Sequence, residues 1–167
     1  MNLNIIRNFV FFIILLIVQV LVLNHIRLFG CATPLLYTYF VLPMQRNQAK
    51  WTTLLWCFAL GLAVDTFSNT PGVAAATMTL AALVQPYLLE LFVPRDSADD
   101  LTPTFRTLGV SKFVSYTIIL VLICCMSFFT IEAFNLYNWM QWASSILGST
   151  AITAILILVI ENVRDRK

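Results

Sequence analysis

Charged residues are scarce in this chain of 167 residues. Lys, Arg, Asp and Glu together make up 11% of the sequence, against about 25% in an average soluble domain, and apolar residues make up 60%. A soluble fold of this length would need polar surface groups that this sequence does not contain. The alternating blocks of about ten residues that are typical of a membrane β-barrel are also missing. Composition therefore predicts an all-α, multi-pass membrane protein, and the net charge of only +2 argues against a nucleic-acid partner.

The sequence also lacks the residue clusters that hold metals or perform catalysis. It has a single histidine, His25, and no pair among its four cysteines has the C-x-x-C spacing of a metal or redox site. All four cysteines lie within apolar segments, so we interpret them as small buried hydrophobic residues. No Ser-His pair or pair of carboxylates stands out. We therefore expect no metal, no cofactor and no enzymatic activity.

Long apolar runs are plentiful, and they define the expected architecture. A helix needs about 17–25 largely apolar residues to cross a hydrocarbon layer about 30 Å thick. Five runs qualify, and a sixth is short and interrupted by Gly30 and Pro34. We therefore expect one integral membrane domain over residues 1–167 with about six transmembrane helices. The expected spans are residues 8–27, 28–43, 51–67, 71–93, 113–134 and 142–161, with a cytoplasmic loop over residues 95–112.

Basic residues indicate the orientation, because loops that stay in the cytoplasm are enriched in Lys and Arg. With six spans, nine of the ten basic residues lie on the inner side and only Arg27 lies outside. A rival arrangement, in which residues 28–43 turn back and the N-terminus lies outside, leaves only Arg7 outside and scores equally well. We favour six spans, because an apolar re-entrant loop of that length has nothing obvious to shelter it. Both termini are then cytoplasmic.

The stretch GLAVDTFSNTPGV, from Gly61 to Val73, places a carboxylate and several polar residues between two apolar runs. Asp65 follows Trp51 by 14 residues, which is roughly 21 Å along a helix and places it near the outer surface. Thr70 is expected to cap the next helix, Pro71 to lie in its first turn, and Gly72 to allow close approach of backbones. Asp65 either binds the free amides at that helix start or contacts another protein or a ligand. Both interpretations stay open.

Small residues spaced four apart are expected to hold the helices together, because lipid tails are as apolar as leucine and association depends on close packing. In the third expected span Ala59 lies over Ala63. In the sixth, Ser145 lies over Ser149. We interpret these stacks as packing within the chain.

The stretch FALGLAVDTFSNTPGVAAATMTLAALVQPYLLELF, residues 58–92, resembles the central signature of the rod shape-determining protein MreD family. The resemblance lies in a Gly-x-x-x-Asp helix end followed by a short polar corner. It implies a non-catalytic component of the bacterial inner membrane that maintains rod shape. Such proteins bind the single-span periplasmic protein MreC and help to couple the MreB cytoskeleton to peptidoglycan synthases. The corner that would serve as a docking site or a structural turn comprises Gly61, Asp65, Asn69, Pro71 and Gly72.

The MreD family is similar in fold to the substrate-binding subunits of energy-coupling-factor vitamin transporters, which gives an alternative function. Short spans interrupted by Pro or Gly often line transporter sites. On that hypothesis a small ligand binds in an outward-facing pocket near Tyr37, Tyr39, Asp65 and Asn69.

Overall fold

The computed structural model describes residues 2–23, 33–45, 49–93, 102–132 and 139–165. All the regular secondary structure in these ranges is helical, as the composition predicts. The elements are α1 (Asn2–Leu21), the 3-10 helix η2 (Leu36–Phe40), α2 (Lys50–Ser68), α3 (Val73–Phe92), α4 (Phe105–Leu108), α5 (Val110–Glu132) and α6 (Trp139–Asp165).

Four of the helices, α2, α3, α5 and α6, are long and apolar enough to cross a membrane. Only 33% to 44% of the residues in their most apolar windows are buried inside the protein, so many of their apolar side chains are at least partly exposed. On α2 the outward residues include Leu55, Phe58 and Leu62, each more than 40% exposed. α1 likewise exposes a row of Ile, Phe and Val side chains. An outer surface of this kind is stable in hydrocarbon rather than in water.

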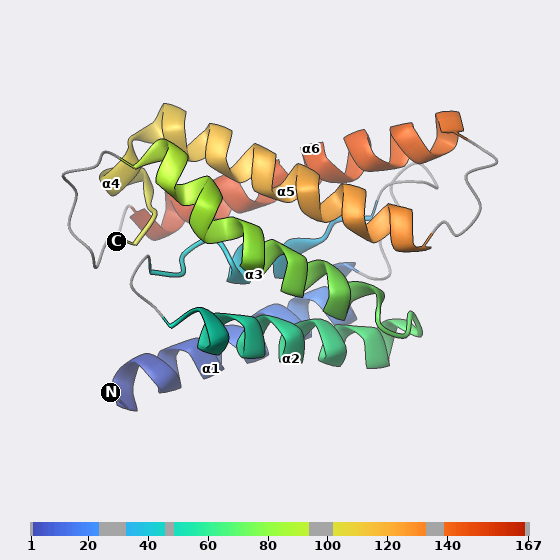
Figure 1. Cartoon of the computed structure of the whole chain (residues 1–167), viewed down its shortest axis with the longest axis horizontal. Helices are drawn as coiled ribbons and strands as arrows, with labels where there is room; N and C mark the ends of the chain where they lie inside the picture. The colour runs from blue at the N-terminus through green and yellow to red at the C-terminus, as the bar shows by residue number, and fades with distance from the viewer. Residues whose placement is uncertain (1, 24–32, 46–48, 94–101, 133–138, 166–167) are drawn as a thin grey trace.

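The helices run along the long axis of the molecule, and both termini lie at the same end (Figure 1). We call this the terminal end, and the opposite one the distal end. Of the five basic residues that the structure describes, four belong to the half of a long helix nearer the terminal end, and the fifth, Arg106, belongs to α4 at that end. The four are Arg7, Lys50, Lys112 and Arg164. This agrees with the charge asymmetry in the sequence.

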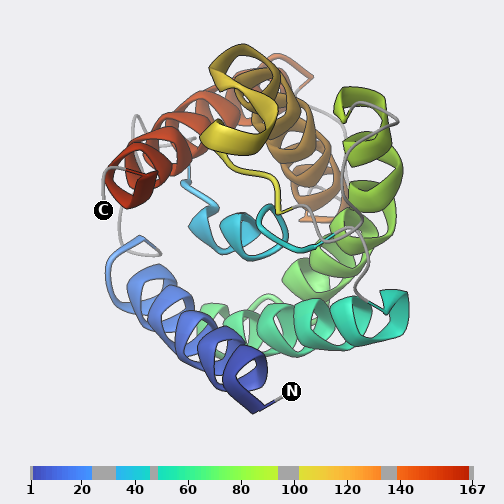
Figure 2. The same ribbon diagram turned by 90° about the vertical axis from the view of Figure 1, so that its left-hand side faces the viewer.

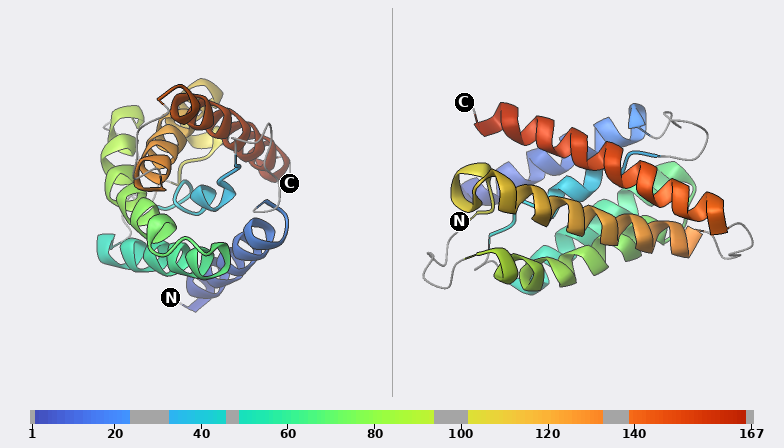
Figure 3. Two further views of the ribbon diagram at one scale, coloured as in Figure 1. Left: turned by 90° about the vertical axis from the view of Figure 1, so that its right-hand side faces the viewer. Right: turned by 90° about the horizontal axis from the view of Figure 1, so that it is seen from above.

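Residues 33–45 lie in the middle of the molecule. Figure 2 shows the long helices arranged around this segment, and the opposite view in Figure 3 shows the same enclosure. Within it the side chains from Leu35 to Leu42 are at most 5% exposed. The segment runs back along the long axis from the end of α1 towards the terminal end (Figure 1). The chain thus fills the centre of its own helical ring.

Side chains from the surrounding helices satisfy the main chain of this central segment. Irregular backbone is tolerated at membrane depth only where protein or water provides its hydrogen bonds. The Thr33 amide donates to Ser149 Oγ at 3.1 Å, and the Leu35 amide donates to Thr153 Oγ1 at 3.0 Å. Gln19 Nε2 donates to the Pro34 carbonyl at 3.0 Å. Several polar residues inside the apolar helices therefore have a structural purpose.

The observed elements differ from the expected spans in several places. α1 begins at Asn2, six residues before the expected span 8–27, and ends at Leu21; residues 24–32, with His25 and the start of expected span 28–43, lie outside the described residues. The rest of that span contains a five-residue 3-10 helix between Pro34 and Pro43, which each lack an amide donor, rather than a longer helix. The expected loop 95–112 contains α4 and the first residues of α5, because Arg106 and Lys112 occupy helical positions and do not mark a loop.

Candidate functional site

The corner between α2 and α3, at the distal end, is organised by Asp65. One carboxylate oxygen, Oδ1, accepts hydrogen bonds from the Ala74 amide at 2.9 Å and the Thr70 hydroxyl at 3.1 Å. The other, Oδ2, accepts from the Ala75 amide at 2.9 Å. The first amides of a helix have no partner within it, and the helix dipole favours an anion at that end. The prediction that Asp65 binds the start of the following helix is therefore confirmed.

Asp65 replaces the usual capping residue of α3. The N-cap position of this helix is Gly72, which has no side chain, whereas an N-cap side chain normally accepts from the second and third helical amides. Those amides belong to Ala74 and Ala75, and both bind Asp65 instead. The prediction that Thr70 caps α3 is wrong, because its hydroxyl donates to Asp65. Pro71 precedes the helix and does not lie in its first turn.

Gly61 brings the two helices close enough for this arrangement. It lies one turn before Asp65 on the same face of α2. A Cβ atom added to Gly61 would lie 2.5 Å from the Cα of Ala75 and 2.6 Å from the main-chain oxygen of Ala74. Distances this short are not found between real Cβ atoms and backbone, so only glycine fits. The spacing Gly-x-x-x-Asp thus combines a helix contact with a cap for the contacted helix.

Two left-handed residues shape the corner itself. Asn69 ends α2 with a φ of 58°, and Gly72 precedes α3 with a φ of 84°. Asn and Gly are the residues that adopt this conformation most readily. The prediction that Gly72 permits close backbone approach is wrong, because a Cβ atom there would meet nothing within 4 Å. Phe67, Asn69, Pro71 and Gly72 are exposed, and we call them the corner surface.

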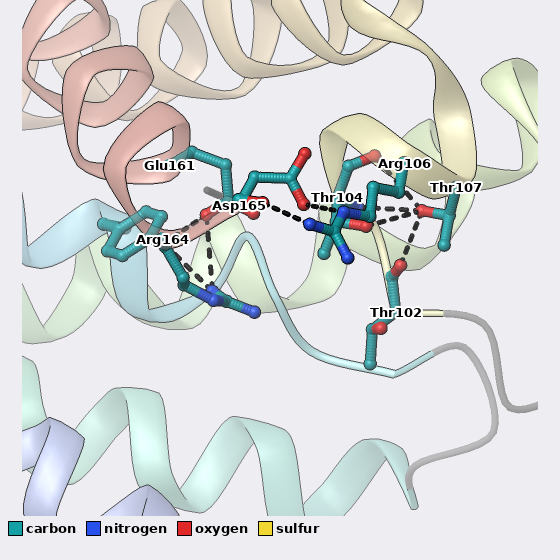
Figure 4. Close-up of polar contacts among 8 residues, drawn as sticks. Thr102, Thr104, Arg106, Thr107, Glu161, Arg164 and Asp165 are labelled. Carbon is teal, nitrogen blue, oxygen red and sulfur yellow. Dashed lines mark hydrogen bonds and ion pairs between the residues drawn. The ribbon is translucent and has the colours of Figure 1, made fainter. Parts of the chain in front are cut away.

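A second polar cluster, at the terminal end, was not predicted from the sequence. Glu161 on α6 is 1% exposed. Its Oε2 accepts hydrogen bonds from the Tyr39 hydroxyl and from Arg164 Nη1, the latter at 3.3 Å. Arg164 Nη1 also donates to the Tyr39 hydroxyl at 3.0 Å. Figure 4 shows Arg164 reaching out from the end of α6 beside Glu161. The three residues fasten the central segment to α6.

The spacing of Glu161 and Arg164 in the sequence is typical of an ordinary ion pair at a helix end. Only the tertiary fold brings Tyr39 to them, since it lies 122 residues away from Glu161. No local pattern marks that contact.

α4 is attached to the end of α6 by a more exposed ion pair. Arg106 Nε lies 2.7 Å from Asp165 Oδ1, and the same guanidinium group donates to the main-chain oxygen of Asp165. Thr107 turns the chain before α4, because its hydroxyl accepts from the Thr104 amide at 2.9 Å and donates to the Thr102 carbonyl at 2.8 Å (Figure 4). The described part of the predicted cytoplasmic loop therefore packs against the end of α6.

The residues expected to line a vitamin pocket do not all gather at one place: Tyr37 lies within electrostatic range of Asp65, whereas Tyr39 is bound elsewhere. Tyr37 and Tyr39 are each 1% exposed within the central segment. The Tyr39 hydroxyl binds Glu161 at the terminal end, whereas Asp65 and Asn69 lie at the distal end. Among the described residues no three His, Cys, Asp or Glu side chains lie close enough together to hold a metal ion. The cysteines in these ranges, Cys57, Cys124 and Cys125, are buried as expected.

These features define a multi-pass helical membrane protein with a filled centre and a capped corner at one end. No protein-family model, curated protein or solved structure matches the chain.

Proposed function

We propose that this chain is a non-catalytic component of the bacterial cell-elongation machinery, an MreD-like protein of the inner membrane. In this role it binds an MreC-like single-span periplasmic protein and helps to couple the MreB cytoskeleton to peptidoglycan synthases. The observation that carries the proposal is the corner between α2 and α3. Its buried side is fixed by Asp65, while its outer side presents Phe67, Asn69 and Pro71 on a rigid backbone. A rigid, exposed turn is suited to docking, since little conformational entropy is lost on binding.

The filled centre favours this function over solute capture. A small-molecule site is usually a cavity of about 300–1,000 Å³ that buries most of its ligand. In this protein the side chains from Leu35 to Leu42 occupy the middle of the helical ring. Polar groups such as Gln19, Ser149 and Thr153 bind the main chain of that segment. This supports a function in which partners are recognised at the surface of the molecule.

The proposed topology has six crossings and cytoplasmic termini, as in the fold that MreD shares with energy-coupling-factor subunits. The clustering of described basic residues at the terminal end supports it. A fluorescent reporter that folds only in the cytoplasm is expected to be active when fused to either end of the chain. Alkaline phosphatase, which is active only outside, is expected to be inactive at both ends. Phosphatase activity at the N-terminus alone would mean that residues 28–43 do not cross.

The docking role is tested by variants of the corner surface. Phe67→Ala removes a ring that is 65% exposed, and Asn69→Gly removes an amide while keeping a residue that accepts a positive φ. Together they are expected to lower co-purification of an MreC-like partner at least tenfold, because a few anchor residues dominate most interfaces. The measurement is the amount of partner that is recovered with the tagged chain from native membranes.

The matched control is Leu91→Ala, which removes an apolar side chain that is 79% exposed near the other end of α3. This variant should recover the partner as well as the unchanged chain does. Equal partner recovery by the corner variants and the control, at equal protein levels, would show that the corner surface does not bind the partner.

A further inference from the structure

A cavity of about 360 Å³ with both polar and apolar walls opens at the terminal end, between the start of α1 and the end of α6. Its lining comprises Arg7, Asn8, Phe11, Pro43, Thr102 and Arg164. It brings together segments that lie far apart in the sequence, and the central segment contributes one wall through Pro43. Neither the corner nor the proposed docking role uses this cavity.

The described residues around the cavity carry a net positive charge. Arg7 makes no ion pair with any residue that the structure describes. Arg164 binds Tyr39 and Glu161 through Nη1, and its remaining guanidinium nitrogens bind no described residue. Glu161, which is buried behind Arg164, offsets one of the two positive charges, while Asp165 pairs with Arg106 outside the lining. Counted over the residues that the structure describes, the cavity therefore has one uncompensated positive charge together with hydrogen-bond donors from Asn8 and Thr102.

We propose that this cavity binds a singly charged phosphate ester. Two guanidinium groups are suited to phosphate oxygens, since each offers paired donors in a fixed geometry. A single net positive charge matches a phosphodiester rather than a doubly charged phosphate. The cavity is near the lower end of the size range for ligand pockets, so it fits a headgroup rather than a whole lipid. Basic pockets between helices on the cytoplasmic side commonly hold anionic headgroups.

Phosphate esters reach this cavity from two sources, an anionic lipid or a free metabolite, and one experiment distinguishes them. The full chain in mild detergent is titrated with phosphatidylglycerol, with phosphatidylcholine and with glycerophosphoglycerol, the soluble phosphodiester that remains when phosphatidylglycerol loses its acyl chains, and bound adducts are counted by native mass spectrometry. We expect phosphatidylglycerol to bind at lower concentration than phosphatidylcholine, and glycerophosphoglycerol to leave it in place. Displacement by glycerophosphoglycerol assigns the cavity to free phosphodiesters, with the same chemistry.

Arg7→Gln is the decisive variant, because Arg7 is exposed and takes part in no ion pair of the described structure. It is expected to raise the phosphatidylglycerol concentration needed for half-saturation about fivefold, since a basic residue at the membrane surface contributes about that factor. Lys112→Gln is the matched control: Lys112 is an exposed cation at the terminal end that does not line the cavity, and its loss should leave binding unchanged.

Thr102→Val is a second variant that removes a hydrogen-bond donor without altering charge. It is expected to weaken phosphatidylglycerol binding less than Arg7→Gln does. Each variant must elute on size exclusion like the unchanged chain. Equal binding of the two lipids, or equal losses from Arg7→Gln and Lys112→Gln, would overturn the proposal, because surface charge alone would then explain the adducts.

Discussion

Replacing Gly61 with alanine is expected to lower the free energy of unfolding by about 3 kcal/mol, the upper part of the usual range for overpacking. The added methyl group would lie 2.5 Å from the Cα of Ala75, so it meets backbone that cannot rotate away. α2 and α3 must then separate, and Asp65 loses its reach to the amides of Ala74 and Ala75. The larger residue in Gly61→Leu is expected to prevent folding altogether. The measurement is the midpoint of thermal unfolding in detergent, followed by fluorescence-detected size exclusion.

Two controls separate this effect from the general cost of changing a small residue. Ala59→Leu adds bulk to an exposed position on the same helix and is expected to be neutral. Gly72→Ala meets no atom within 4 Å, but it places alanine at a φ of 84°, so a loss of about 1–2 kcal/mol is expected from backbone strain. Equal stability of Gly61→Ala and Ala59→Leu would contradict the close helix contact.

The long helices could be predicted because hydrocarbon imposes a length on any helix that crosses it. The expected spans 51–67 and 71–93 correspond to α2 and α3 within two residues at each end. The start of α5 and both ends of α6 differ from the expected spans by three or four residues, since the helices extend further there than their apolar cores. Charged residues continue both helices beyond the apolar stretch: Lys112 is exposed in the first turn of α5, and Asp165 at the end of α6 pairs with Arg106. Hydropathy alone marks only the part of a helix that lipid or protein covers.

The surroundings of the central segment, residues 33–45, could not be predicted from the sequence. Its residues are as apolar as those of a membrane helix, and the sequence predicts correctly that they avoid water. Apolar composition does not distinguish burial in lipid from burial in protein, because both surroundings are equally free of water. Burial in protein differs from burial in lipid in that protein can satisfy the hydrogen bonds of irregular backbone. Here those bonds depend on Gln19, Ser149 and Thr153 from distant parts of the chain. No local pattern links these residues to positions 33–35.

The expectation that small residues spaced four apart pack between helices is correct on α6 but wrong on α2, because it too depends on tertiary contacts. Ser145 and Ser149 are buried, as expected, and Ser149 binds the central segment. Ala59, by contrast, is exposed, although it lies over Ala63 at the same spacing. The residue on α2 that does make a close contact is Gly61, which the sequence marked only through its resemblance to a family signature. Spacing identifies faces of a helix, but it does not say which face has a neighbour.

Replacing Asp65 with alanine is expected to destabilise the protein by about 2–5 kcal/mol. The change leaves two buried amides without acceptors, and each unsatisfied group costs about 1–3 kcal/mol. Asp65→Asn keeps one acceptor oxygen and should lose roughly half as much. Thr70→Val removes only the weakest of the three bonds, at 3.1 Å, and should lose about 1 kcal/mol. The ranking of the three variants by thermal unfolding midpoint checks whether the carboxylate acts as the cap of α3.

The double variant Gly61→Ala, Asp65→Ala tests whether the two residues act together. Gly61→Ala already pushes α3 beyond the reach of the carboxylate, so removing that carboxylate as well should cost much less than it does alone. Neighbouring residues that share one contact are non-additive by about 0.5–3 kcal/mol, whereas independent residues are additive. Full additivity would mean that the glycine contact and the cap are separate features. Unchanged melting of Asp65→Ala, combined with loss of partner recovery, would instead assign the carboxylate to the docking interface.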